Sequence, residues 1–327
     1  MFKKQQSKQA YLLMTIILLL TFALSYHPLG WATPLGKVDH QVSDSIRPSP
    51  TLTIANTPQA QFSRLEESLP KEIKTLLRAY PEHLKTATAD TKNSGQLLWH
   101  HGAPSTWQLP KRFYDLKTWS KLGTEEQKTL WRGQDFETVL NQASLAEQLL
   151  QIYPKDAPLP QELPLNFEPG RLRDEAFFKR IYGSSRKKVA QYIRHIYWGK
   201  QKLKVTTLYQ IDRRLEAIYQ ELTQLPKRYR KYYEPSAGAF HWRTIKGTKR
   251  LSVHSFGAAI DIGVKYSNYW KWTLKVYGRD KQGHIPYKNK FPEEIIRIFE
   301  RYGFIWGGWW YHHDSMHFEF RPELLLD

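Results

Sequence analysis

The chain has 327 residues, of which 41% are hydrophobic and 24% are charged, and its formal net charge is +18. This composition is that of a folded globular protein with one large domain or two ordinary ones. The chain has no cysteine, which fits export without disulfides and excludes both thiolate zinc ligands and a cysteine nucleophile.

The N-terminus predicts export. Three lysines precede an apolar run at residues 11–26, and Gly30-Trp31-Ala32 supplies small residues at both positions that determine cleavage. We therefore predict that residues 1–32 are a secretory signal peptide. The apolar run is shorter than the roughly 20 residues of a full membrane span, which favours a cleaved signal over an uncleaved anchor. The protein is expected in the periplasm or outside the cell.

The basic charge suggests polyanions as partners. Removing residues 1–32 would take away only three lysines, so the mature chain stays strongly basic. For an exported protein we expect no nucleic acid, but anionic wall polymers or lipid head groups are available. The alternative is a solvated basic surface with no specific partner.

Residues 33–61 are rich in Pro, Ser, Thr and Gln and predict a flexible linker. A mainly helical region is predicted over residues 62–231, because apolar residues recur there at three- and four-residue steps. Its clearest helix covers Lys204–Leu225 and ends before Pro226. The other predicted helices cover residues 63–80, 124–131, 135–153, 174–182 and 185–198, and residues 96–99 are a candidate strand.

The pattern changes at about residue 232. Strands are predicted at residues 238–245, 258–264, 304–306 and 316–320, and a helix is predicted to begin at Pro292. The predicted fold class is therefore α+β, with a compact C-terminal domain at 232–327 that carries a small antiparallel sheet and follows the helical region.

The first chemical motif reads Ser-Val-His-Ser-Phe-Gly-Ala-Ala-Ile-Asp over residues 252–261. Asp261 lies in an apolar strand, where an unpaired carboxylate is costly to bury and a cation would compensate its charge. His254 stands seven residues earlier and could ligate the same cation. Gly257 permits a backbone turn between the two ligands.

A second motif, Asp-Ser-Met-His at residues 314–317, completes a candidate zinc centre. A catalytic zinc takes three protein ligands and keeps its fourth position open for water. His254, Asp261 and His317 have the right types in the right number. Asp314 precedes the last ligand by three residues, where it could take the proton of that water.

The pattern Ser-x-His-x-x-Gly-x-Ala-x-Asp with a later Asp-x-x-His resembles the zinc D-alanyl-D-alanine carboxypeptidase family. This family includes VanY-like carboxypeptidases, D-Ala-D-Ala dipeptidases and L-alanyl-D-glutamate endopeptidases, and it shares its metal site with lysostaphin-type peptidases and the hedgehog signalling domain. The resemblance implies a hedgehog-like fold, zinc held by His254, Asp261 and His317, and Asp314 as the catalytic base. It also implies peptidoglycan stem peptides as the substrate.

Further residues take roles from the same resemblance. Arg243 matches a family arginine that would stabilise the tetrahedral oxyanion. Ser252 and Trp309 match family residues near the substrate. His312 and His313 are neighbours of the site that could ligate metal or bind substrate, but we interpret them as exposed residues without a role of their own.

Several alternatives stay open. The sequence does not separate a D-Ala-D-Ala carboxypeptidase from an L-Ala-D-Glu or crosslink endopeptidase. Residues 169–183 resemble the helical extension of exported family members, and the pattern assigns them at most a bracing role. The competing functions are a non-catalytic cell-wall binder that retains the zinc-site fold and a polyanion-binding protein.

Overall fold

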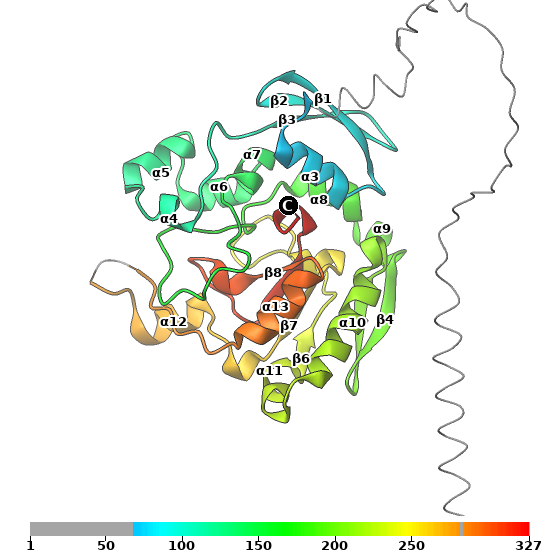
Figure 1. Ribbon diagram of the computed structural model, residues 1–327, viewed down its shortest axis with the longest axis vertical. Coiled ribbons are helices and arrows are strands. Elements are labelled where there is room, and N and C mark those ends of the chain that lie inside the picture. The colour runs from blue at the N-terminus through cyan, green and yellow to red at the C-terminus, as the bar shows by residue number, and fades with distance from the viewer. Residues whose placement is uncertain (1–67, 282–283, 327) are drawn as a thin grey trace, which may run out of the picture. The chain divides into compact units, whose positions relative to one another are not determined.

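The computed structural model describes residues 68–281 and 284–326 (Figure 1). The predicted signal peptide and linker lie outside these residues, so their predictions are untested. Within the described part of the chain, no helix combines the length and the apolar character that a membrane crossing requires.

A helix and a three-stranded antiparallel sheet open the described chain (Figure 1). Helix α3 (Lys71–Ala79) begins directly after Pro70 and buries Ile73 and Leu76. The candidate strand at residues 96–99 is confirmed as the end of β2. The strands follow the chain in the order β1 (Leu84–Thr91), β2 (Ser94–Trp99) and β3 (Ser105–Gln108).

Short helices follow this sheet. The segment 135–153, predicted as one helix, forms two, because the backbone of Ala143 leaves the helical region at ψ 130° and Ser144 caps a new helix through Ala146 N. Glu147 completes that cap by accepting from Ser144 N. The helices are α4 (Leu116–Trp119), α5 (Thr124–Leu130), α6 (Phe136–Gln142), α7 (Leu145–Leu149), α8 (Glu175–Tyr182) and α9 (Arg186–Ala190).

A β-hairpin corrects the prediction of a mainly helical region. Residues 193–198, predicted as the end of one helix, and residues 204–206, predicted as the start of the next, belong instead to β4 (Ile193–Trp198) and β5 (Gln201–Thr206). Buried and less buried side chains largely alternate along each strand, as they do in a sheet. The three- and four-residue spacing of the apolar residues, which predicted a helix, is therefore misleading here. Only the second part of the predicted 204–225 helix is helical, as α10 (Ile211–Gln224). The buried positions are Ile196, Trp198, Leu203, Val205 and, at the end of β5, Thr206.

The C-terminal sheet has four antiparallel strands in the order β6-β7-β9-β8. Helix α13 lies across this sheet in Figure 1, and the ring of Phe299 stacks on that of Phe318 at 4.0 Å between centroids. The first predicted strand is shorter and earlier than expected, because residues 239–251 form an irregular loop. The elements are α11 (Arg230–Tyr233), β6 (Ser236–Gly238), β7 (Ala259–Ile262), α12 (Trp270–Tyr277), α13 (Glu293–Arg301), β8 (Phe304–Trp306) and β9 (His317–Phe320).

One hydrophobic core crosses the boundary predicted at residues 231 and 232. Its buried side chains run from Leu69 to Leu325 and come from both predicted regions. Buried hydrogen bonds join the same regions, with Tyr153 Oη donating to Glu300 at 2.8 Å. A second, smaller cluster, from Tyr114 to Leu172, lies within the first predicted region. The described chain is thus a mixed helix and sheet structure with small antiparallel sheets.

Candidate active site

Three short elements bring the candidate ligands together. His254 lies in a single 3-10 turn at residues 253–256, Asp261 lies in β7, and His317 begins β9. Asp261 and His317 are register partners in neighbouring strands, so their side chains share one face of the sheet. Gly257 has φ +69°, and a Cβ there would lie 2.9 Å from the backbone nitrogen of Thr206. The predicted turn between the first two ligands therefore needs glycine.

The three side chains converge on one point. His254 Nε2 lies 3.1 Å from Asp261 Oδ1 and 3.2 Å from His317 Nδ1, and these last two atoms are 2.9 Å apart. Ligand atoms at 2.0–2.1 Å around a tetrahedral ion lie roughly 3.3 Å from one another. Two imidazole nitrogens and one carboxylate oxygen at this spacing form a group that could hold a metal ion.

Second partners orient both imidazoles. His254 Nδ1 lies 2.6 Å from the carbonyl oxygen of Ala239, and His317 Nε2 lies 3.0 Å from Glu319 Oε2. When these nitrogens carry the ring protons, His254 Nε2 and His317 Nδ1 present their lone pairs to the shared point. Acceptors behind ligand histidines are typical of metal sites.

A chain of buried charges continues from His317 along β9 and beyond. Because alternate residues of a strand face the same side, Glu319 follows His317 on one face of β9, and Arg321 and Glu323 come just after the strand ends. Arg321 Nη1 lies 3.0 Å from Glu319 Oε1, and Arg321 Nε lies 2.7 Å from Glu323 Oε1. Tyr80 Oη donates to Glu323 at 2.6 Å. The candidate ligand is thus tied to residues at the start of the described chain.

The electrostatics of the candidate ligands favour their charged forms. Burial alone would raise the pKa of Asp261, but His254 and His317 outweigh it and hold that pKa below its usual value. Burial alone would lower the pKa of His317, but hydrogen bonds to Asp261 and Glu319 raise it to about 10. A proton and a metal ion would therefore compete for this site, so metal affinity should fall as the pH falls.

Asp314 lies in the turn before β9, where its backbone nitrogen donates to Gly307 O at 2.9 Å. Its Oδ1 is buried and has no hydrogen-bond partner among the residues that the structure describes. Burial first, and the charge of Asp261 second, raise the pKa of Asp314 to about 6. A carboxylate with a free oxygen and a pKa near neutrality is suited to proton transfer.

A cavity of about 260 Å³ contains these groups. Helix α12 and the preceding turn contribute Tyr269 and Trp270 to its wall, and the segment before α8 contributes Arg171 and Arg173. A larger hollow of about 860 Å³, lined by α4, α5 and residues 152–165, contains none of the candidate site residues. The chemistry is therefore concentrated in the smaller cavity. The candidate residues that line it are Arg243, Ser252, His254, Asp261, Asp314 and His317.

The expected substrate contacts divide into two groups. Arg243 and Ser252 line the cavity, and the guanidinium of Arg243 is exposed, with no hydrogen bond to any described residue. Trp309, in contrast, is fully buried in the core and does not line the cavity. Its neighbour Trp310 does, because Trp309 lies in a 3-10 turn that directs consecutive side chains differently.

The interpretation of His312 and His313 as exposed is wrong, because both are buried. His312 stacks on Phe136 with ring centroids 5.0 Å apart, and its Nδ1 is in close contact with Glu168 Oε1. Glu168 also accepts from Arg171 Nη1 at 3.1 Å. The run Glu-Pro-Gly-Arg-Leu-Arg at residues 168–173 thus forms a wall of the site. The two closely spaced arginines of this run are the sequence feature from which its place in the site could have been predicted.

Replacing Glu168 with glutamine should destabilise this wall. Burial alone would raise the pKa of Glu168, but Arg171 and His312 hold it below its usual value. A carboxyl group whose pKa is lower in the folded than in the unfolded protein stabilises the fold at a pH above its unfolded pKa, which is about 4.3 for glutamate. This stabilisation is lost as the pH falls through the pKa of the folded state. In urea unfolding, the variant should therefore be less stable than the wild type by about 1–3 kcal/mol at pH 7 and by less at pH 3.5. An equal difference at both pH values would contradict the assignment.

A buried His-Asp-His group beside an unpartnered carboxylate defines a candidate metallohydrolase centre. Residues 246–320 match the model of a family described as D-alanyl-D-alanine carboxypeptidase. The match confirms the resemblance to that family for this segment of the chain and supports a peptidase. The matched stretch includes the three candidate ligands and Asp314, but not Arg171, Arg173 or Arg243. Comparisons with curated proteins and with solved structures find no significant match.

Proposed function

We propose that this protein is an exported zinc peptidase that hydrolyses peptide bonds in peptidoglycan stem peptides. The convergence of His254, Asp261 and His317 beside the free oxygen of Asp314 carries this proposal. The family match supports the same class of reaction. Export is supported by the signal-peptide pattern of residues 1–32.

The donor set fits zinc, which accepts imidazole nitrogen and carboxylate oxygen and needs no thiolate. His254 Nε2, Asp261 Oδ1 and His317 Nδ1 would hold the ion. Zinc bound there would polarise the scissile carbonyl and lower the pKa of a bound water.

The remaining chemistry belongs to side chains of the cavity. Asp314 Oδ1 would accept the proton of the attacking water, and the same carboxyl would return a proton to the leaving amine. Arg243 is exposed and free of described partners, so its guanidinium can move to the carbonyl oxygen as negative charge develops there. Tyr269, Trp270 and Trp310 would bound the space for the peptide.

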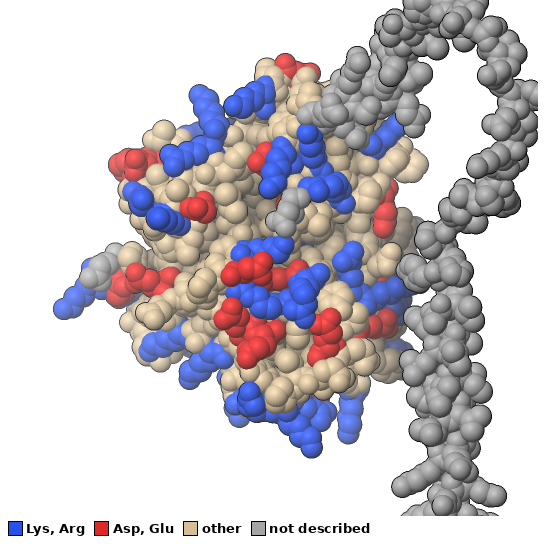
Figure 2. Space-filling view, viewed as in Figure 1, with Lys and Arg blue, Asp and Glu red and all other residues tan. Residues whose placement is uncertain are grey.

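The two non-enzymatic alternatives are less well supported. Figure 2 shows lysine and arginine side chains scattered over one face with acidic side chains among them, rather than a continuous basic patch. A purely non-catalytic binder would not need the free oxygen of Asp314, which is costly to bury without a partner.

Metal removal tests the proposal directly. Purified protein should contain about one zinc per chain and should digest muropeptides, and a chelator should abolish the digestion until zinc is restored. The His254→Ala variant should lose both zinc and activity, because the two ligands that remain, Asp261 and His317, are too few to hold the ion. Mass spectrometry of the products would identify the bond that is cut. Digestion that is indifferent to the chelator would refute zinc dependence.

A further inference from the structure

Two buried arginines beside the cavity have no ion-pair partner. Arg173 and Arg250 are each 2% exposed, and neither forms an ion pair with a carboxylate in the described parts of the chain. Arg173 Nη2 donates only to the carbonyl oxygen of Leu251, and Arg250 Nη2 donates only to backbone carbonyls at 3.3 and 3.4 Å. Arg173 Nη1 and two nitrogens of Arg250 have no partner among the described residues.

This arrangement differs from that of Arg171 and Arg321, the other arginines nearby that are not exposed. Arg171 pairs with Glu168, and Arg321 pairs with Glu319 and Glu323. A buried guanidinium without a carboxylate is costly, because it loses its hydration and gains no opposite charge. Burial accordingly lowers the pKa of Arg173 to about 10. The fold thus retains an excess of positive charge at this point.

The neighbouring carboxylates are already engaged. Glu319 binds both His317 and Arg321, and Glu175 pairs with Lys179 at 2.7 Å and accepts from Leu251 N at 3.2 Å. Arg173 is therefore not needed to neutralise either of them. Of Arg173 and Arg250, only Arg173 lines the cavity with the candidate metal ligands; Arg243, which also lines it, is exposed to solvent.

We propose that Arg173 binds a carboxylate of the substrate peptide and thereby selects which peptides enter the cavity. This inference rests on the proposed peptidase function. Arg173 Nη1 would donate a charge-assisted hydrogen bond to this carboxylate, and burial would strengthen the bond. The carboxylate is either the free C-terminus, as a carboxypeptidase requires, or the free carboxyl of the D-glutamate residue, as an endopeptidase acting beside that residue would meet.

The size of the cavity supports a small anionic end group. Its volume of about 260 Å³ is below the roughly 300–1,000 Å³ of pockets that enclose drug-sized ligands. It therefore suits one or two small residues of a peptide. A carboxylate on such a short segment would lie within the same enclosure as the candidate metal ligands and Arg173.

Three versions of one stem pentapeptide test the inference: the free acid, the C-terminal amide, and a peptide with an amidated D-glutamate carboxyl. For wild-type protein, amidation of the recognised carboxylate should lower kcat/KM about 10- to 100-fold, the size of one charge-assisted hydrogen bond, and amidation of the other should not. The peptide that is affected identifies the source of the carboxylate. Equal cleavage of all three within twofold would overturn the inference.

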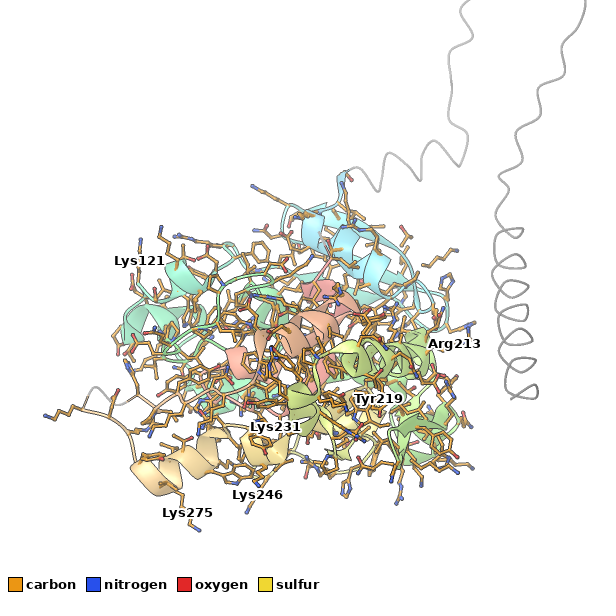
Figure 3. All side chains as sticks on the ribbon, turned by 60° about the horizontal axis from the view of Figure 1, so that its bottom comes forward. Lys121, Arg213, Tyr219, Lys231, Lys246 and Lys275 are labelled. Atoms are coloured by element: carbon orange, nitrogen blue, oxygen red, sulfur yellow. The ribbon has the colours of Figure 1, made fainter. Side chains whose placement is uncertain are left out.

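The Arg173→Gln variant separates recognition from structure. It should cleave the acid and the amide at similar rates, whereas a merely structural role would lower both by the same factor and keep their ratio. Arg173→Lys should restore part of the preference, because it keeps the charge but not the planar fork. Lys246→Gln is the matched control, since Lys246 is a cavity-lining cation that lies at the surface in Figure 3, and it should keep the wild-type ratio.

Calorimetric binding of the acid and amide peptides keeps the inference testable if no peptide is cleaved. Absence of cleavage by zinc-loaded wild-type protein would refute the proposed function. Tighter binding of the acid, lost in Arg173→Gln, would still support the carboxylate site. Equal binding of acid and amide, or no binding of either, would overturn it.

Discussion

Replacing Asp314 with alanine is expected to lower kcat on stem peptides by about 10²–10⁴-fold, the usual contribution of a positioned acid-base group. The reason is that Oδ1 of Asp314 is buried and has no hydrogen-bond partner among the described residues, so it is free to accept a proton. Zinc content should stay near one ion per chain, because the three ligand atoms converge without Asp314. Steady-state kinetics and metal analysis of the same preparation measure both quantities.

The Glu137→Gln variant provides the matched control. Glu137 is an acidic side chain that lines the same cavity, but it is exposed and does not belong to the group of converging ligands. Its kcat should stay within about twofold of the wild type, because no step is assigned to it. Normal turnover by the Asp314→Ala protein would transfer the base role to another group. Loss of zinc from that protein would make Asp314 a metal ligand instead.

The largest effect on stability is expected for Arg321→Met. Arg321 is fully buried and holds Glu319 and Glu323, and its Nη1 also contacts the carbonyl oxygen of Gly170. Removal of the guanidinium would leave two buried carboxylates without their shared cation. Breaking a buried ion pair in this way typically costs about 3–5 kcal/mol in the free energy of unfolding. The midpoint of urea denaturation at neutral pH would report the change.

Arg301→Met is the comparison for that experiment. Arg301 also pairs with a glutamate, Glu221, but its side chain is 58% exposed and water replaces the lost interaction. The expected loss is below about 1 kcal/mol. If both variants lost the same amount, the buried chain of charges along β9 would have no special role in stability.

The positions of the candidate ligands could be predicted because each signal was local. A carboxylate in the apolar sequence around Asp261 and a glycine that needs a positive φ at residue 257 are visible without coordinates. The wall of the cavity could not be predicted in this way. Arg171, Arg173 and Glu168 reach the site from about 80 residues before His254, and only the packing of distant segments brings them there.

Errors in the fold have a similar physical origin. Residues 193–206 contain apolar side chains at spacings that fit either a helix or a strand, and the pairing of β4 with β5 decided between them. Trp309 and Trp310 are adjacent and chemically equivalent in sequence, so the choice of which one faces the cavity depends on a single 3-10 turn. The strands at 258–264, 304–306 and 316–320 were strongly apolar, and their existence was predicted correctly.

The segment before α8 supplies one wall of the cavity from outside the stretch that matches the family. Under the proposed function, substitutions within residues 168–173 would change the accepted peptide and leave the candidate ligands and Asp314 in place. Two proteins with identical ligand motifs would then differ in substrate specificity. The residues that determine this specificity should be sought first in the segment that precedes those motifs.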